Sequence, residues 1–351
     1  MLYRIILIAL FLLTLSACST IDYFSHLAKG QFDLLWQRES VLDLLESEDV
    51  SDDVKSRLKL SQQIRLFAEA ELALPVGDAY TAYTDLERPY VVWNLYAAPQ
   101  LSFDSYTWCY PFLGCLAYRG FYDEARAQHA ANQLIKEGYE VKVGGVQAYS
   151  TLGFFDDPLL NTFLFIHEVG FVELLIHEIS HRRLYIDDDT KFNENFATAV
   201  ALLGAEEWYE QQKNQSLYTR YQQHKTAQKK LIGFLLGFKQ QLELVYNDDT
   251  KTEEEKQLLK KKIFNQLPIQ FQEFKHKHDL DKRYDKWVLS MNNASLSTLA
   301  NYQELVAGFI ALFHKQGGDW YRFYVEVESI AKLDKQERHQ FLTDLAEVIS
   351  E

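Results

Sequence analysis

Residues 177–197, HEISHRRLYIDDDTKFNENFA, predict two helices joined by a short loop, and the rest of the fold can be placed around them. Residues four apart in a helix rise about 6 Å and lie on one face, so His177 and His181 present two imidazoles to one metal ion. Glu178 lies next to His177 in the helix, where its carboxylate can contact a water molecule bound to that metal. A catalytic zinc site takes three protein ligands and leaves the fourth position open. We expect Glu194, thirteen residues past His181, to be the third ligand.

The residues on both sides of the first histidine are mostly apolar. Residues 171–176 precede it, and Leu184 and Ile186 follow, which predicts a helix buried on most sides. Buried histidine and glutamate side chains are costly without a partner such as a metal. We therefore predict one Zn²⁺ per chain, with Glu178 as the general base. For Glu194 an alternative stays open, since the helix dipole also favours a glutamate in the first turn of a helix.

Three aspartates, Asp187, Asp188 and Asp189, lie between the two predicted helices. We expect them to be turn and N-cap residues, although one of them could also orient a ligand histidine through a hydrogen bond. His167 and Glu168 begin like a second metal motif, but no histidine follows at the required spacing. This dipeptide is therefore interpreted as the start of the helix that carries His177 and His181.

The first twenty residues, MLYRIILIALFLLTLSACST, have the pattern of a secretory signal. A positive charge at Arg4 is followed by an apolar run and then by Leu-Ser-Ala-Cys, which resembles a bacterial lipobox. We predict that residues 1–17 are removed, that Cys18 is lipidated, and that residues 18–30 form a tether. The protein would then be lipid-anchored in the cell envelope and face the periplasm. Ser19 after the cysteine indicates the outer membrane, and an uncleaved anchor is the alternative.

Charge and cysteine content limit the partners and the compartment. The formal net charge of −14 argues against nucleic acid and against anionic lipid surfaces as partners. Apart from Cys18, the chain has two cysteines, Cys109 and Cys115. In an oxidising compartment we expect them to form a disulfide, and two buried thiols are the alternative.

The pattern of apolar residues predicts an α+β protein that is mostly helical, with a small sheet in its N-terminal half. We expect an α+β subdomain over residues 31–165 and a helical zinc-site subdomain over residues 166–351. The second of these contains a helical hairpin over residues 205–285. Finer expectations are two helices within 31–74, strands at 90–96, 115–122 and 140–149, a helix at 123–137, and closing helices at 299–313 and 319–347.

The motif at residues 177–181 followed by NENFA at 193–197 resembles the gluzincin metallopeptidases, and it is similar to the alanyl-aminopeptidase type. The resemblance is closer to a bacterial family of predicted zinc aminopeptidases, which are HExxH lipoproteins, and it covers nearly all of residues 25–345. The resemblance implies a zincin-like fold that hydrolyses peptide bonds in peptide or protein substrates. The segments that carry it are RPYVVWNLYAAPQLS (88–102), WCYPFLGCLAYRGF (108–121), GGVQAYSTLGFFDDPLLNTF (144–163) and HEISHRRLYIDDDTKFNEN (177–195).

Alanyl-type aminopeptidases place a Gly-x-Met-Glu-Asn strand before the zinc helix, and its glutamate binds the free amine of the substrate. The chain has no such segment. We expect Asp156 or Asp157 to take this role at the mouth of the cleft, although turn formation beside Pro158 also explains both residues. The strand ending near Tyr149 is expected to pair with the substrate backbone.

Hydrolysis of an amide also needs a donor for the oxyanion, usually a tyrosine or histidine. Tyr302 is our first choice, and Tyr149 and Tyr185 are the other candidates. The expected function is zinc-dependent peptide-bond hydrolysis by an aminopeptidase of the envelope. The alternatives are a zinc endopeptidase of envelope proteins and a non-hydrolytic, zinc-binding assembly or chaperone-like lipoprotein. Glu178 argues against the last of these, because a structural zinc site is closed by a fourth protein ligand and needs no general base.

Overall fold

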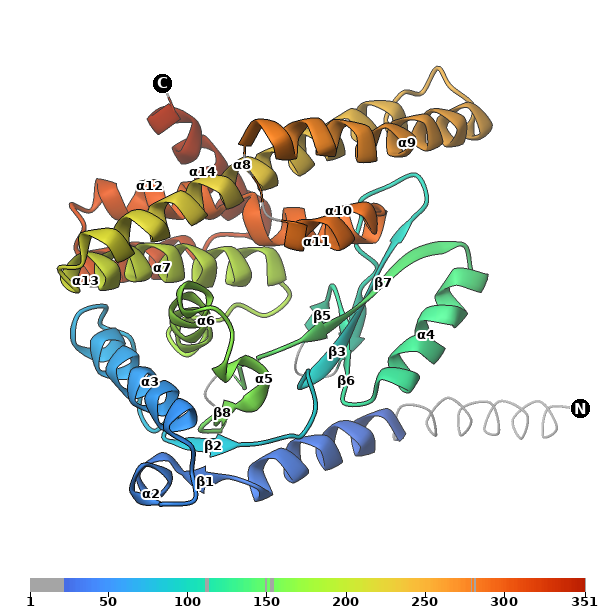
Figure 1. Ribbon diagram of the computed structural model, residues 1–351. Coiled ribbons are helices and arrows are strands. Elements are labelled where there is room, and N and C mark those ends of the chain that lie inside the picture. The colour runs from blue at the N-terminus through green and yellow to red at the C-terminus, as the bar shows by residue number, and fades with distance from the viewer. Residues whose placement is uncertain are drawn as a thin grey trace, which may run out of the picture.

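The computed structural model describes residues 22–110, 114–148, 150–151, 155–278, 280 and 282–350, except the side chains of residues 283, 300–303 and 348–350. Within these residues the protein is α+β and mostly helical, as predicted (Figure 1). The strands are β1 (Glu39–Ser40), β2 (Ala82–Thr84), β3 (Val92–Pro99), β4 (Trp108–Tyr110), β5 (Gly114–Leu116), β6 (Arg119–Phe121), β7 (Tyr139–Val146) and β8 (Leu159–Leu160). The helices are a first helix over 22–36, α2 (Val41–Glu46), α3 (Asp52–Ala70), α4 (Glu124–Lys136), α5 (Asn161–Leu164), α6 (Glu168–Ser180), α7 (Thr190–Gln211), α8 (Gln215–Tyr246), α9 (Glu253–His278), η1 (Lys282–Tyr284), α10 (Asp285–Leu289), α11 (Asn293–Gln303), α12 (Val306–Lys315), α13 (Trp320–Ile330) and α14 (Lys335–Ser350).

Helix α4 packs on one face of the antiparallel sheet β6-β3-β7, and the start of the first helix lies on the same side (Figure 1). Alternate residues of a strand point to opposite faces, and β3 uses both faces. Trp93, Leu95 and Ala97 pack against the buried face of α4, whereas Val92 belongs to the larger core of the protein. The sheet therefore has apolar contacts on both sides, which explains the nearly continuous apolar sequence of β3.

Helices α6 and α7 pack against each other at the centre of the molecule (Figure 1). Phe171, Val172 and Ile176 of α6 are fully buried, as are Phe192 and Phe196 of α7. The same apolar core also contains residues from the first 165 positions. The division into two subdomains at residue 165 stays a prediction.

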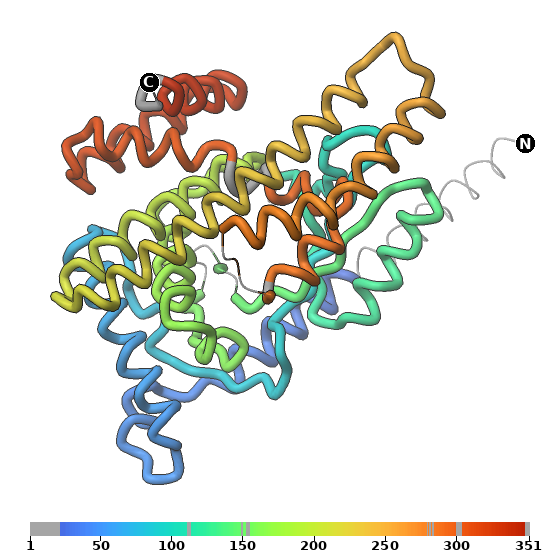
Figure 2. The backbone as a smooth tube through the Cα atoms, turned by 45° about the horizontal axis from the view of Figure 1, so that its top comes forward, coloured from blue at the N-terminus to red at the C-terminus, as the bar shows by residue number. Residues whose placement is uncertain are grey.

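Helices α8 and α9 form a long antiparallel hairpin with its own apolar core (Figure 2). Leu235, Phe238 and Leu242 of α8 pack in one cluster with Leu267 and Phe271 of α9. The hairpin begins at the start of α8 rather than at residue 205, because α7 continues to Gln211.

The prediction of two continuous closing helices is wrong, because the structure interrupts each of them. The helix predicted at 299–313 is broken between α11 and α12, where the backbone N–H of Leu305 donates to Asn195 Oδ1 of α7 at 2.9 Å. The helix predicted at 319–347 is broken between α13 and α14. There the side chain of Asp334 accepts hydrogen bonds from the backbone of Gln336 and Glu337, both at 3.0 Å.

Cys109 and Cys115 form a disulfide across the hairpin β4-β5, where they stand opposite each other. The backbone N–H of Cys115 donates to Asp188 Oδ1, in the loop between α6 and α7. This contact attaches the disulfide hairpin to the loop that joins the two central helices.

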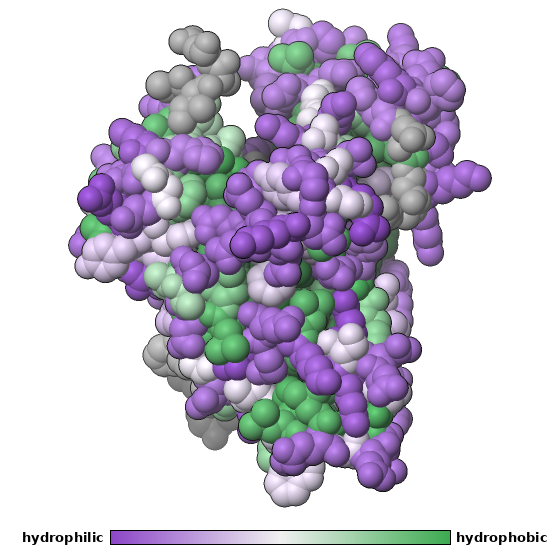
Figure 3. Space-filling model, turned by 60° about the vertical axis from the view of Figure 1, so that its left-hand side comes forward, coloured by the Kyte–Doolittle hydropathy of each residue, from purple (hydrophilic) through white to green (hydrophobic). Residues whose placement is uncertain are grey.

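The surface is mainly hydrophilic, and Figure 3 shows its hydrophobic side chains in separate patches on one face. Among the described residues, none of the helices combines the length and the apolar character that crossing a bilayer requires. Cys18 and the predicted signal, residues 1–17, lie outside the described part of the chain.

Candidate metal centre

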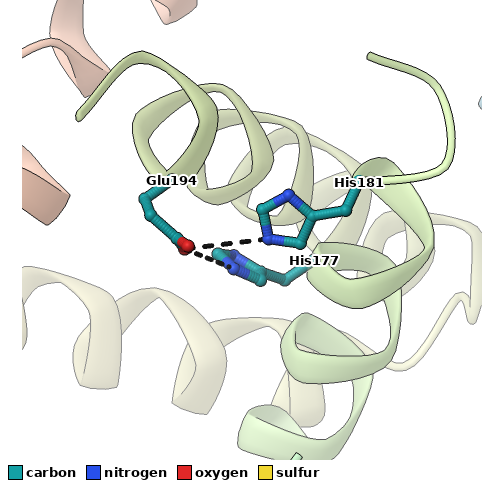
Figure 4. Close-up of side chains that lie close together, drawn as sticks. All are labelled: His177, His181 and Glu194. Atoms are coloured by element: carbon teal, nitrogen blue, oxygen red, sulfur yellow. Dashed lines mark hydrogen bonds and ion pairs between the residues drawn. The ribbon is translucent and has the colours of Figure 1, made fainter. Parts of the chain in front are cut away.

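Three side chains from α6 and α7 converge on one point (Figure 4). His177 lies in the last turn of α6, His181 is its C-cap, and Glu194 lies in the second turn of α7. Glu194 Oε2 is 3.2 Å from His177 Nε2 and 3.7 Å from His181 Nε2. One ligand atom from each residue lies within 4.8 Å of the others. The structure thus brings together the three residues predicted to bind zinc.

The spacing of these atoms matches what a zinc ion requires. Ligands at about 2.0–2.2 Å from zinc in tetrahedral geometry are roughly 3.3 Å from one another. The two distances from Glu194 lie on either side of this value. Two imidazoles and a carboxylate are also the ligand types of catalytic zinc sites. The donor set therefore fits zinc in both chemistry and separation.

Glu178 is buried beside the two histidines, with 7% of its surface exposed. Burial raises the pKa of its carboxyl, and His177 and His181 partly oppose this shift. For Glu194, burial also acts to raise the pKa, but the charge of His181 and the hydrogen bonds from both histidines outweigh burial. The pKa of Glu194 is lowered to about 2. Two neighbouring glutamates therefore differ in character, one ionised and one able to carry a proton.

The start of α7 is fixed by its own side chains. Asp189 is the N-cap, and its side chain accepts from the backbone of Phe192 at 3.1 Å. Asn193 closes the loop by bonding to Ile186 twice, accepting from its N–H at 2.9 Å and donating to its carbonyl at 2.7 Å. Asp189 was predicted as a cap, but the structural role of Asn193 was not. The asparagines on either side of Glu194 position the backbone that carries this residue.

Helix α14 also holds this loop. Asp189 is fully buried and forms ion pairs with Arg338 at 3.1 Å and with His339 at 2.9 Å. Lys335 donates to the backbone carbonyl of Asp188 at 2.6 Å. Burial acts to raise the pKa of Asp189, but His339 outweighs it, so that the pKa is lowered. The buried Nδ1 of His181 has no hydrogen-bond partner among the described residues, so no described aspartate orients this histidine.

A cavity of about 2020 Å³ opens over the metal centre. Its wall includes His177, Glu178, His181 and Glu194, together with apolar residues from the first helix, the sheet and α8. It also includes the tyrosines Tyr96, Tyr118 and Tyr185.

Two of these tyrosines lie close to the charges of the metal centre. Burial raises the pKa of Tyr118 well above its usual value, and the carboxylate of Glu194 adds to the effect. The same two causes raise the pKa of Tyr185 to about 12. Both phenols therefore stay protonated and available as donors. Tyr185 was a predicted donor, whereas Tyr118 was missed, although it lies in one of the segments that carry the family resemblance.

Among the described residues, the predicted substrate-binding residues Asp156 and Asp157 are not part of the cavity wall. Asp156 pairs with Arg182 at 3.5 Å, and the buried Asp157 accepts from the backbone of Thr151 at 2.9 Å. Neither aspartate is part of the cavity wall, but the charge of Asp157 acts on Glu178, and their role at the mouth of the cleft stays a prediction. Tyr149 lies outside the described residues, and so does the side chain of Tyr302 in α11.

Comparison with known proteins supports the resemblance to an aminopeptidase family. The family model described as "Putative aminopeptidase" matches residues 22–342, which is most of the chain. Searches of curated proteins and of solved structures each found no match. The matched range contains the metal centre, the cavity and the disulfide hairpin. The chain belongs to this aminopeptidase family.

Proposed function

We propose that this protein is a zinc-dependent aminopeptidase of the bacterial envelope. The observation that carries this proposal is the convergence of His177, His181 and Glu194 in the wall of a large cavity, with Glu178 buried beside them. The family match supports the aminopeptidase activity, and the chemistry of the donor set supports zinc.

In this proposal His177, His181 and Glu194 hold the ion. A zinc ion bound there supplies a water molecule of lowered pKa and polarises the carbonyl group of the scissile bond. Glu194 suits the role of ligand because its lowered pKa keeps it ionised. Its carboxylate already accepts a hydrogen bond from His177 and lies in ion-pair range of His181.

Side chains of the protein then transfer the protons and donate hydrogen bonds. Glu178 accepts a proton from the attacking water and passes it to the leaving amine, and burial, which raises the pKa of its carboxyl, favours its holding that proton between the two steps. Tyr118 and Tyr185 are protonated phenols in the same cavity wall, so they are placed to donate to the oxyanion that forms.

An endopeptidase is the second candidate, and the size of the cavity favours it. A cavity of about 2020 Å³ is larger than the roughly 300–1,000 Å³ of ordinary small-molecule pockets. It accommodates more than one or two residues of a peptide. Comparing a peptide with its N-acetylated form separates the two candidates, because an aminopeptidase requires the free amine.

We also propose that the protein is anchored through a lipid on Cys18 and faces the periplasm. The lipobox-like sequence supports this location, and the Cys109–Cys115 disulfide is consistent with an oxidising compartment. Two or three acyl chains suffice for stable anchoring where one does not.

The metal and activity proposals are tested together on the mature protein produced without its lipid. We expect one zinc per chain, complete loss of bound zinc in His181→Ala, and full zinc with lost hydrolysis in Glu178→Gln. Glu210→Gln is the matched control, since Glu210 is an exposed glutamate of α7. Full zinc retention in His181→Ala contradicts the ligand assignment. Undiminished hydrolysis in Glu178→Gln contradicts the catalytic role of that glutamate, and a pure protein that binds zinc but cleaves no peptide favours the non-hydrolytic alternative.

A further inference from the structure

The disulfide hairpin β4-β5 lies directly against the loop between α6 and α7. In that loop the Oδ1 atom of Asp188 accepts a hydrogen bond from the backbone N–H of Cys115. The neighbouring Gly114 lies so close to the same carboxylate that a Cβ atom there would overlap it. Asp188 lies seven residues after His181 and six residues before Glu194. The hairpin therefore contacts the segment that joins two of the proposed metal ligands.

Both sides of this contact have a left-handed backbone. The φ angle is 69° at Gly114 and 62° at Asp188. Glycine adopts this conformation without strain, and aspartate tolerates it better than most residues do. The backbone of Asp188 is also held by Lys335 of α14, which donates to its carbonyl oxygen at 2.6 Å. The loop thus keeps Asp188 in a conformation that directs its carboxylate to the hairpin.

The hairpin depends on its disulfide for closure. Among the described residues, β4 and β5 pair only with each other, and an isolated two-stranded hairpin is marginally stable. Cys109 and Cys115 stand opposite each other and close it covalently. Cys109 is an exposed residue, and exposed disulfides are the ones that reductants reach most readily. The shape of the hairpin therefore depends on a bond that a reagent in solution can break.

The hairpin also leads to a tyrosine of the cavity wall. Tyr118 follows the end of β5 by two residues and lines the same cavity as the metal centre. The centroid of its ring is 6.0 Å from that of Tyr96 in β3. The disulfide is thus connected to the metal centre in two ways, along the chain to Tyr118 and through the hydrogen bond to Asp188.

We propose that catalysis depends on the oxidation state of the Cys109–Cys115 disulfide, through the contact between Cys115 and Asp188. This inference rests on the proposed peptidase function and adds a redox control to it. In the oxidised protein the closed hairpin holds the loop before Glu194 and the position of Tyr118. Reduction by two electrons breaks the S–S bond, and uptake of two protons leaves two thiols. The opened hairpin then releases Asp188, while the packing of α6 on α7 keeps the metal ligands together.

The first test uses zinc-loaded, lipid-free protein that begins at Ser19, so that no third cysteine is present. Its kcat for Leu-Leu-Leu amide is measured before and after reduction by a phosphine, which has no thiol to compete for zinc. The phosphorus atom loses two electrons and gains the oxygen of one water molecule, and the two protons of that water complete the thiols. We expect kcat to fall about 10-fold, the effect of one charge-assisted hydrogen bond, with unchanged zinc content.

The double variant Cys109→Ser with Cys115→Ser is the matched control for the reagent. It should have the kcat of the reduced wild type, and the phosphine should not change it further. A wild-type enzyme whose kcat is the same in the oxidised and the reduced state overturns the proposal.

Variants of Asp188 test the path from the disulfide to the loop. Asp188→Gly removes the acceptor and keeps the left-handed backbone, whereas Asp188→Asn keeps both. We expect oxidised Asp188→Gly to have the kcat of the reduced wild type and to change little on reduction. Asp188→Asn should respond to reduction as the wild type does. If reduction lowers kcat equally in the wild type and in Asp188→Gly, the two effects are independent and the path through Asp188 is wrong.

Hydrogen exchange on the metal-free protein gives a readout without hydrolysis. After reduction we expect the backbone amides of residues 183–192 to exchange about 10-fold faster, and those of α9 to be unchanged. Oxidised Asp188→Gly should show the same acceleration. An unchanged exchange rate in a protein that cleaves the peptide overturns the proposal alone. Acceleration in a protein that cleaves no peptide in either state refutes the peptidase function instead, so the two failures are distinguishable.

Discussion

Replacing Asp189 by asparagine measures how strongly α14 holds the start of the helix that carries Glu194. Asparagine is as good an N-cap as aspartate, so the hydrogen bond to Phe192 is kept. The charge is lost, and Arg338 and His339 are left facing a neutral amide. Removing one partner of a buried ion pair costs about 3–5 kcal/mol. We expect the free energy of unfolding to fall by about 3 kcal/mol in Asp189→Asn, and by about 1 kcal/mol more in Asp189→Ala, which also lacks the cap.

Urea unfolding of the metal-free protein, followed by circular dichroism, gives these free energies without a contribution from bound metal. Asp187→Asn is the matched control, because Asp187 is an exposed residue of the same loop and should change stability by less than about 0.5 kcal/mol. A loss below about 1 kcal/mol in Asp189→Asn refutes the view that this ion pair fixes the loop.

The pH dependence of the free energy of unfolding follows from the lowered pKa of Asp189. A carboxyl with a lowered folded-state pKa contributes its full stability above its unfolded pKa, near 4, and loses it as the pH falls through the folded-state value. The stability difference between wild type and Asp189→Asn should therefore be constant from about pH 5 to 6 and shrink as the pH falls below about 4. If the stability difference between wild type and Asp189→Asn is the same at pH 3 as at pH 5 to 6, the predicted direction of the pH dependence is wrong.

Three further predictions concern other residues. Tyr118→Phe should lower kcat by about 10²–10³ with little change in KM, as expected for loss of an oxyanion donor, whereas an unchanged kcat excludes that role. Cys109 and Cys115 should both resist thiol labelling in the unfolded, unreduced protein, and their reduction should lower stability by about 2–3 kcal/mol through loop closure; two labelled thiols contradict the bridge. Intact-mass measurement of the protein from its native host should find residues 1–17 absent and Cys18 acylated, and retention of Met1 excludes the lipoprotein assignment.

The parts of the site that depend on local spacing could be predicted from sequence. His177 and His181 are four residues apart in one helix, and the aspartate-rich loop ends in the N-cap of the next helix. Both features are set by helix geometry and capping, which act over a few residues. Strand β3 could also be predicted from sequence, because its nearly continuous apolar residues are buried on both faces of the sheet.

Features that depend on distant residues could not be predicted in this way. The break between α11 and α12 is fixed by Asn195, which is 110 residues earlier in the chain. Tyr118 reaches the metal centre only because the sheet and the disulfide hairpin place it there.

The contacts of α14 also set an order of events during synthesis. Asp189 and its partner His339 are 150 residues apart, so the loop before Glu194 leaves the ribosome long before the residues that fix it. At 5–20 residues per second the interval is roughly 8–30 s. During that interval α6 and α7 can form, but the loop between them lacks its buried counter-charge. A nascent chain that has not yet reached α14 therefore lacks the ion pairs that hold the loop before Glu194.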